Sequence, residues 1–137
     1  MQVFDRIPFL RGLMVVWVGY GLVWIVLEGG LWSVVLMGVL STAVSILQFW
    51  QKRLAGQFVA KWKFLLGTAV SGLALGMGSA ALTLIFMAVK TGLHAHGPEF
   101  SQAEIEWVLA QIPLWAVAGL LLGLGVGLLL VGSSVTE

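Results

Sequence analysis

Long apolar stretches alternate with short polar breaks along the whole chain. Four stretches contain no charged residue: Gly12–Leu27, Leu31–Trp50, Phe64–Val89 and Leu114–Gly132. The hydrocarbon core of a bilayer is about 30 Å thick, and a helix of about 20 apolar residues crosses it. Because backbone polar groups in lipid must be bonded within their own segment, each stretch is expected to be an α-helix.

The pattern therefore predicts an all-α integral membrane protein with four transmembrane helices, arranged as two antiparallel hairpins. The expected spans are residues 8–27, 31–50, 64–89 and 114–132, within a single membrane domain that covers residues 1–137. Glu28-Gly29-Gly30 reads as a tight turn between the first two spans. No small-residue cleavage pattern follows the first span, so we interpret it as a retained helix rather than a signal peptide.

A short helix is predicted on the outer face, before the fourth span. Ser101-Gln102-Ala103-Glu104 has the spacing of a capping box, with Ser101 as N-cap and Glu104 at the third helical position. The helix is expected to cover residues 102–111. Pro113 is expected to end or kink it where the last span begins.

The connection between the second and third spans is basic and contains regularly spaced apolar residues. Trp50, Leu54, Phe58 and Trp62 recur every four residues, which would place them along one face of a helix. Such a basic amphipathic helix could lie among lipid headgroups or dock a partner subunit. An ordinary basic loop whose aromatic residues anchor the neighbouring spans explains the same residues.

Basic residues are distributed unevenly between the two sides of the predicted membrane domain. One side carries Arg6, Arg11, Lys52, Arg53, Lys61 and Lys63, whereas the other carries Lys90. The positive-inside rule then places both termini in the cytoplasm. Tryptophans near the span ends are expected to be interfacial anchors: Trp24, Trp32 and Trp107 outside, Trp50 and Trp62 inside.

Composition excludes several classes of protein. Hydrophobic residues make up 60% of the 137 residues, and the mean hydropathy is +1.04, well above the usual apolar share of soluble proteins of about 45–50%. The absence of cysteine excludes disulfides and thiol chemistry within the chain. A net charge of +1, with the basic residues beside predicted spans, argues against nucleic-acid binding. Small size, lack of cysteine and lack of an organelle signal favour the bacterial cytoplasmic membrane.

Small residues at spacing four mark the strongest packing motif. The predicted fourth span contains Gly119, Gly123 and Gly127, and the third contains Gly72, Gly76 and Ala80. In lipid, such glycine-zipper faces let helix backbones approach closely. They predict either an antiparallel pair of the third and fourth spans within one chain, or a face for a second copy or a partner.

His94 and His96 are candidate ligands for a metal ion or a pigment. Alternate residues of an extended segment point the same way, so both rings could face one ligand, with Glu99 nearby. A metal site usually needs three or four ligands, so a solvated or protein-packed loop is the stronger interpretation. No cofactor is required by the sequence, although bound lipid or pigment is compatible with it.

The lack of charges within the apolar stretches and of catalytic motifs limits the functions that the sequence favours. No charge lies within any of the four apolar stretches, which argues against an ion-coupled transporter, and no catalytic motif is present, so the chain is not expected to be an enzyme. The favoured hypothesis is a small accessory subunit that stabilises a larger energy-converting or transport complex in the membrane. The alternatives are an autonomous oligomeric transporter or channel, and a pigment-, quinone- or lipid-binding module.

Overall fold

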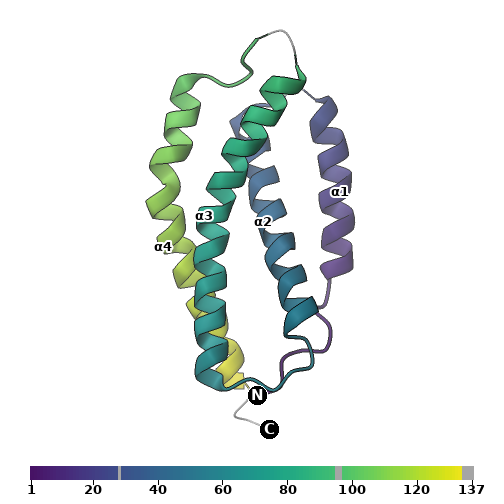
Figure 1. The fold of residues 1–137 in the computed structure, drawn as a ribbon, viewed down its shortest axis with the longest axis vertical. Helices are drawn as coiled ribbons and strands as arrows, with labels where there is room; N and C mark the ends of the chain where they lie inside the picture. The colour runs from purple at the N-terminus through teal and green to yellow at the C-terminus, as the bar shows by residue number, and fades with distance from the viewer. Residues whose placement is uncertain (28, 95–96, 134–137) are drawn as a thin grey trace.

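The protein folds into four α-helices that run side by side (Figure 1). The computed structural model describes residues 1–27, 29–94 and 97–133. The helices are α1 (Leu10–Val26), α2 (Leu31–Arg53), α3 (Lys61–Leu93) and α4 (Gln102–Ser133). Helices α2, α3 and α4 are long and apolar enough to cross a membrane, whereas α1 is a shorter apolar helix of 17 residues. The predicted all-helical membrane architecture is confirmed at this level.

Helix α3 is the central helix of the arrangement. Helices α2 and α4 both pack against α3, and α1 packs against α2. As a result α1 and α4 lie at opposite edges (Figure 1). Helix α3 has 33 residues, a length of about 50 Å, so it must tilt in a bilayer or extend beyond the hydrocarbon.

The predicted break between an outer-face helix and the fourth span is wrong. Residues 102–133 form the single helix α4, with Pro113 inside it. Proline removes one backbone hydrogen bond but leaves the remaining helical ladder intact, and neighbouring helices help membrane helices to tolerate it. The predicted cap is confirmed, because the Ser101 backbone N–H donates to Glu104 Oε2 at 2.8 Å and Glu104 N–H donates to Ser101 Oγ at 3.3 Å.

Of the two interpretations of residues 50–62, the continuous helical face is wrong, and residues 54–60 form a connection without a helix. Helix α2 ends at Arg53, and Gly56 adopts a left-handed conformation with φ of 73°. Residues 1–8, which we call the N-terminal strap, lie along this connection. Backbone hydrogen bonds join Val3 N–H to Gln57 O at 2.9 Å and Val59 N–H to Met1 O at 3.0 Å. This pairing replaces the helical hydrogen bonds that the four-residue spacing suggested.

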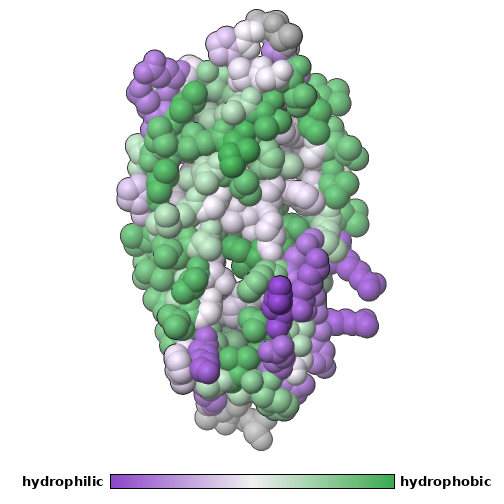
Figure 2. All heavy atoms as spheres, in the orientation of Figure 1, coloured by the Kyte–Doolittle hydropathy of each residue, from purple (hydrophilic) through white to green (hydrophobic). Residues whose placement is uncertain are grey.

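The two ends of the molecule differ in charge and packing, and we name them accordingly. The basic end contains the strap, the α2–α3 connection and every described lysine and arginine except Lys90. The Lys90 end contains the α3–α4 connection. In Figure 2 an apolar surface occupies most of the view, with hydrophilic side chains gathered at the top and in the lower part. The buried hydrophobic cluster lies toward the Lys90 end: Trp24, Val34, Met37, Ala80, Met87, Phe100 and Val108.

Candidate functional site

Lys90 is a buried cation that joins α3 to the carboxyl end of α1. Its side chain is 1% exposed, and Nζ donates hydrogen bonds to Leu27 O at 2.6 Å and Trp24 O at 3.3 Å. The ammonium also lies 4.9 Å from the centroid of the Trp24 ring. The carbonyl end of a helix carries partial negative charge and lacks intrahelical donors, so Lys90 satisfies carbonyls that would otherwise lie unpaired near lipid.

Two further ionisable side chains extend this cluster into the α3–α4 connection. Glu99 Oε2 lies 3.9 Å from Lys90 Nζ, and Glu99 Oε1 lies 2.7 Å from His94 Nδ1. The Glu99 side chain is only 9% exposed. A nearby cation stabilises a buried carboxylate, and the Lys90 ammonium supplies one, although neither Glu99 oxygen accepts a hydrogen bond from the described residues. This cluster ties α1, α3 and the α3–α4 connection together.

The predicted histidine pair is described in part. His94 directly follows α3 and faces Glu99, whereas His96 lies outside the described residues. Within residues 1–27, 29–94 and 97–133, no group of three potential ligands is close enough to hold a metal ion. His94 therefore pairs with Glu99 in the described part of the chain.

The small residues predicted for helix packing lie between α3 and α4. A Cβ placed on Gly72 would collide with the Gly119 carbonyl oxygen, and one on Gly76 would collide with the Trp115 carbonyl oxygen. Likewise, Gly123 faces the Thr68 carbonyl, Gly127 faces the Thr68 hydroxyl, and Ala80 is completely buried. The two backbones touch along this seam, so the same faces are used within one chain.

A second close approach of two helices, α2 and α3, was not predicted from the sequence. A Cβ on Gly38 would lie 2.7 Å from the Ser79 carbonyl oxygen, and one on Gly78 would lie 2.8 Å from Thr42 Cγ2. The signal was present as Gly38 and Thr42, two small residues four apart. Because α2 contains few glycines, this pair was less conspicuous than the regularly spaced glycines of α4.

Hydroxyl groups inside the long helices bond to the fold itself. Thr42, Ser45, Ser79 and Thr83 each donate to the carbonyl four residues earlier, at 2.6–2.9 Å. Such bonds are common for serine and threonine in helices and need no partner outside the helix. These side chains therefore have no unsatisfied donor to offer a passing solute.

The predicted tryptophan anchors occupy two kinds of position. Trp32 and Trp62 are 71% and 65% exposed, as membrane-facing anchors should be. Trp107 packs edge-on against Trp32, with ring centroids 5.6 Å apart. Trp24 is 4% exposed and lies in the hydrophobic cluster, and Trp50 Nε1 donates to Ser71 Oγ at 2.8 Å. Trp24 therefore serves internal packing rather than contact with lipid.

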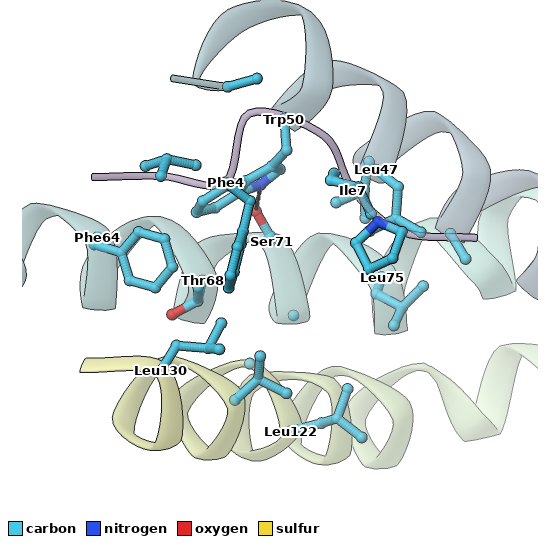
Figure 3. A pocket seen from close by; sticks show the side chains of 18 residues that line it. Phe4, Ile7, Leu47, Trp50, Phe64, Thr68, Ser71, Leu75, Leu122 and Leu130 are labelled. Atoms are coloured by element: carbon cyan, nitrogen blue, oxygen red, sulfur yellow. Dashed lines mark hydrogen bonds between the residues drawn. The ribbon is translucent and has the colours of Figure 1, made fainter. Parts of the chain in front are cut away.

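An apolar cavity of about 360 Å³ lies near the basic end. It is lined by the strap, α2, α3 and α4, with Ala55 from the α2–α3 connection (Figure 3). The strap crosses one side and directs Phe4 toward α3, as Figure 3 shows. The cavity volume falls within the range of about 300–1,000 Å³ that is usual for small-molecule sites. Sequence patterns gave no sign of it, because it depends on the placement of the strap.

The walls of this cavity are almost entirely hydrocarbon. Ile46 and Leu47 contribute from α2, Leu75 from α3, and Leu122 and Val126 from α4. The indole N–H of Trp50 and the hydroxyl of Ser71 are bonded to each other. The site therefore suits an apolar ligand, and it offers no acid–base group or metal ligands.

Comparison with models of protein families, with curated proteins and with solved structures finds no match to this chain.

Proposed function

We propose that this protein is a small non-catalytic membrane subunit that packs against a larger membrane protein and stabilises it. The edge helix α1 is the docking surface in this proposal. The larger partner would belong to an energy-converting or transport complex, and the membrane would be the bacterial cytoplasmic membrane.

The shortness of α1 carries the proposal. With 17 residues, α1 is about 25 Å long, less than the hydrocarbon thickness of about 30 Å. Only Leu10, Gly21 and Trp24 of this helix are buried. A short apolar helix produces a hydrophobic mismatch, and association with other helices is one way to relieve it. By contrast, α2, α3 and α4 exceed the hydrocarbon thickness without a partner.

The internal hydrogen bonds of the long helices support a structural role over transport. A polar solute or ion crossing the membrane needs exposed polar or charged groups along its path. The hydroxyls of Thr42, Ser45, Ser79 and Thr83 are bonded to their own helices. The buried ionisable cluster lies at the Lys90 end rather than midway along α3.

The proposed orientation places the basic end in the cytoplasm. Six basic residues and the strap lie there, and Lys90 lies at the other end. The positive-inside rule favours this orientation. It also places α1 across the membrane from a cytoplasmic strap to the Lys90 cluster.

Site-specific photo-crosslinking in the native membrane tests the proposal. A photoreactive residue replaces Leu22 in α1, which is 65% exposed, and a matched control replaces Leu129 in α4, which is 76% exposed. We expect the Leu22 position to crosslink to one larger membrane protein, which native mass spectrometry of the extracted complex finds at fixed stoichiometry. The Leu129 position is expected to crosslink mainly to lipid. Crosslinks only between copies of this chain would overturn the proposal and favour an autonomous oligomer.

A further inference from the structure

The cavity near the basic end has the depth of one lipid leaflet. Its lining residues extend along α3 from Phe64 to Leu75, a distance of about 16 Å at the usual helical rise. That is roughly half of the hydrocarbon thickness of about 30 Å. The cavity therefore begins at one membrane surface and ends near the middle of the bilayer, as a single acyl chain does.

The polarity of the walls matches the hydrocarbon part of a lipid. Trp50 and Ser71 bond to each other, and the hydroxyl of the third polar lining residue, Thr68, donates to Leu65 O at 2.9 Å. The surface left to contact a ligand is methyl, methylene and aromatic. A polar ligand would lose its hydrogen bonds with water and gain none here, and that loss would disfavour its binding. A saturated or unsaturated hydrocarbon chain suffers no such loss.

Basic residues lie close in sequence to residues that line the cavity near the basic end. Arg6 directly precedes the lining residue Ile7, Arg53 lies two residues before the lining residue Ala55, and Lys61 lies one helical turn before Phe64. All three basic side chains are exposed. Among the described residues, none of them forms an ion pair within the chain. Exposed cations at a membrane surface attract anionic lipid headgroups.

The amino end of α3 adds to the positive potential at the same place. Helix α3 begins at Lys61, and its N-cap Ala60 provides no side-chain hydrogen bond. The first N–H groups of a helix lack intrahelical acceptors, and their partial positive charge favours an anion nearby.

From these observations we propose that the cavity binds one acyl chain of an anionic phospholipid, with its headgroup against Arg6, Arg53 and Lys61. The strap forms one wall of the site, and Phe4 packs against the bound chain (Figure 3). This site does not depend on the docking of α1, because its walls come from the strap and from α2, α3 and α4.

Native mass spectrometry of the full-length protein, delipidated and then titrated with defined lipids, tests the acyl-chain part. Val126→Trp fills the cavity from α4, and Leu129→Trp places the same side chain on a 76% exposed position outside the cavity wall. We expect one phosphatidylglycerol to bind the wild type and the Leu129→Trp variant equally. Binding to the Val126→Trp variant should fall at least about tenfold. Equal binding to all three proteins would overturn the proposed site.

A second cavity-filling variant keeps the test valid if the Val126→Trp variant fails to fold. Ala43→Phe fills the same cavity from α2, and circular dichroism in detergent shows whether each variant keeps its helices. Reduced lipid binding by every one of the two variants that folds, with the Ala43→Phe variant among them, supports the site. A folded Ala43→Phe variant with wild-type binding contradicts it, whatever the state of the Val126→Trp variant.

The headgroup part is tested by lipid preference. We expect phosphatidylglycerol to bind the wild type at least about tenfold more tightly than phosphatidylcholine with the same chains, since three nearby cations contribute. The triple variant Arg6→Gln, Arg53→Gln, Lys61→Gln should lose this preference and keep its chain binding. Equal affinity of the wild type for both lipids would overturn the role of the basic residues. Occupancy by detergent or a neutral quinone in place of the phospholipid would contradict the proposed ligand.

Discussion

The two ends of this helical bundle use their polar residues differently. At the Lys90 end, Lys90 and Glu99 turn inward: Lys90 is buried against α1 carbonyls and Glu99, and the hydrophobic cluster packs beside it. At the basic end, charged groups turn outward, and the space between the helices is a cavity of about 360 Å³. The Lys90 ammonium bonds to two α1 carbonyls and lies beside a packed hydrophobic cluster, whereas unfilled apolar space lacks packing contacts. The comparison assigns stability to one end and ligand binding to the other.

Among the changes proposed, removal of the buried Lys90 cation should lower the stability most. Lys90→Met keeps the length of the side chain but leaves Leu27 O without its donor and Glu99 without Lys90. Breaking a buried charged pair typically costs about 3–5 kcal/mol. We expect a loss of this size in a denaturation series in mixed micelles followed by circular dichroism. Lys63→Met, at an exposed basic residue, should change stability by no more than about 0.5 kcal/mol, and similar losses for both variants would contradict the structural role of Lys90.

Truncation of one apolar residue at each end compares their packing directly. Met87 is 3% exposed in the hydrophobic cluster, whereas Leu75 lines the cavity. Met87→Ala should cost about 2–5 kcal/mol because it creates a void in a packed region. Leu75→Ala should cost about 1 kcal/mol, since its neighbours already border open space. The same denaturation series measures both, and a larger loss for Leu75→Ala would reverse the assignment of the packed end.

A substitution at Gly56, in the left-handed turn of the α2–α3 connection, should have a smaller effect on stability. Gly56 has φ of 73° and its hypothetical Cβ would lie 3.1 Å from Asp5 Oδ1, so Gly56→Ala should destabilise the protein by about 1 kcal/mol. Gly125→Ala in α4 meets nothing within 4 Å and should be neutral or slightly stabilising. If both substitutions stabilise, the turn does not constrain the strap as described.

The smallest effect is expected at Phe58 in the α2–α3 connection. Its side chain is 82% exposed although its backbone forms a bridge with Gln2. Phe58→Ala should therefore change the unfolding free energy by no more than about 0.5 kcal/mol in mixed micelles. A loss above about 2 kcal/mol would show that this aromatic ring has a buried role in the fold.

Local patterns in the sequence predicted the helices and the capping box well, because both depend on near neighbours. The apolar stretches gave four helices, and Ser101 and Glu104 gave the start of α4. Spacing alone could not show that α4 continues through Pro113, since that depends on how the rest of the helix is supported. The spacing of Trp50, Leu54, Phe58 and Trp62 was misleading, because pairing with a distant strap determines that connection.

The candidate sites were much harder to predict from the sequence. Lys90 and the Trp24 carbonyl are 66 residues apart, and no local pattern connects a lone lysine to the end of another helix. The six small residues of the α3–α4 seam were recognisable by their spacing, but spacing did not distinguish a partner within the chain from a second copy. The cavity could not be predicted from the sequence, since its walls come from the strap, the α2–α3 connection and three helices.

Hydrogen–deuterium exchange of the full-length protein in nanodiscs tests the central claim most directly, because it reports on both ends at once. Nanodiscs of phosphatidylglycerol are compared with nanodiscs of phosphatidylcholine that have the same acyl chains. We predict slower exchange in phosphatidylglycerol for strap residues 1–8 and connection residues 54–60, with unchanged exchange around Trp24, Lys90 and Glu99. Equal protection of the basic end in both lipids, or a lipid-dependent change centred on Lys90, would contradict the division of the molecule into a stabilising end and a lipid-binding end.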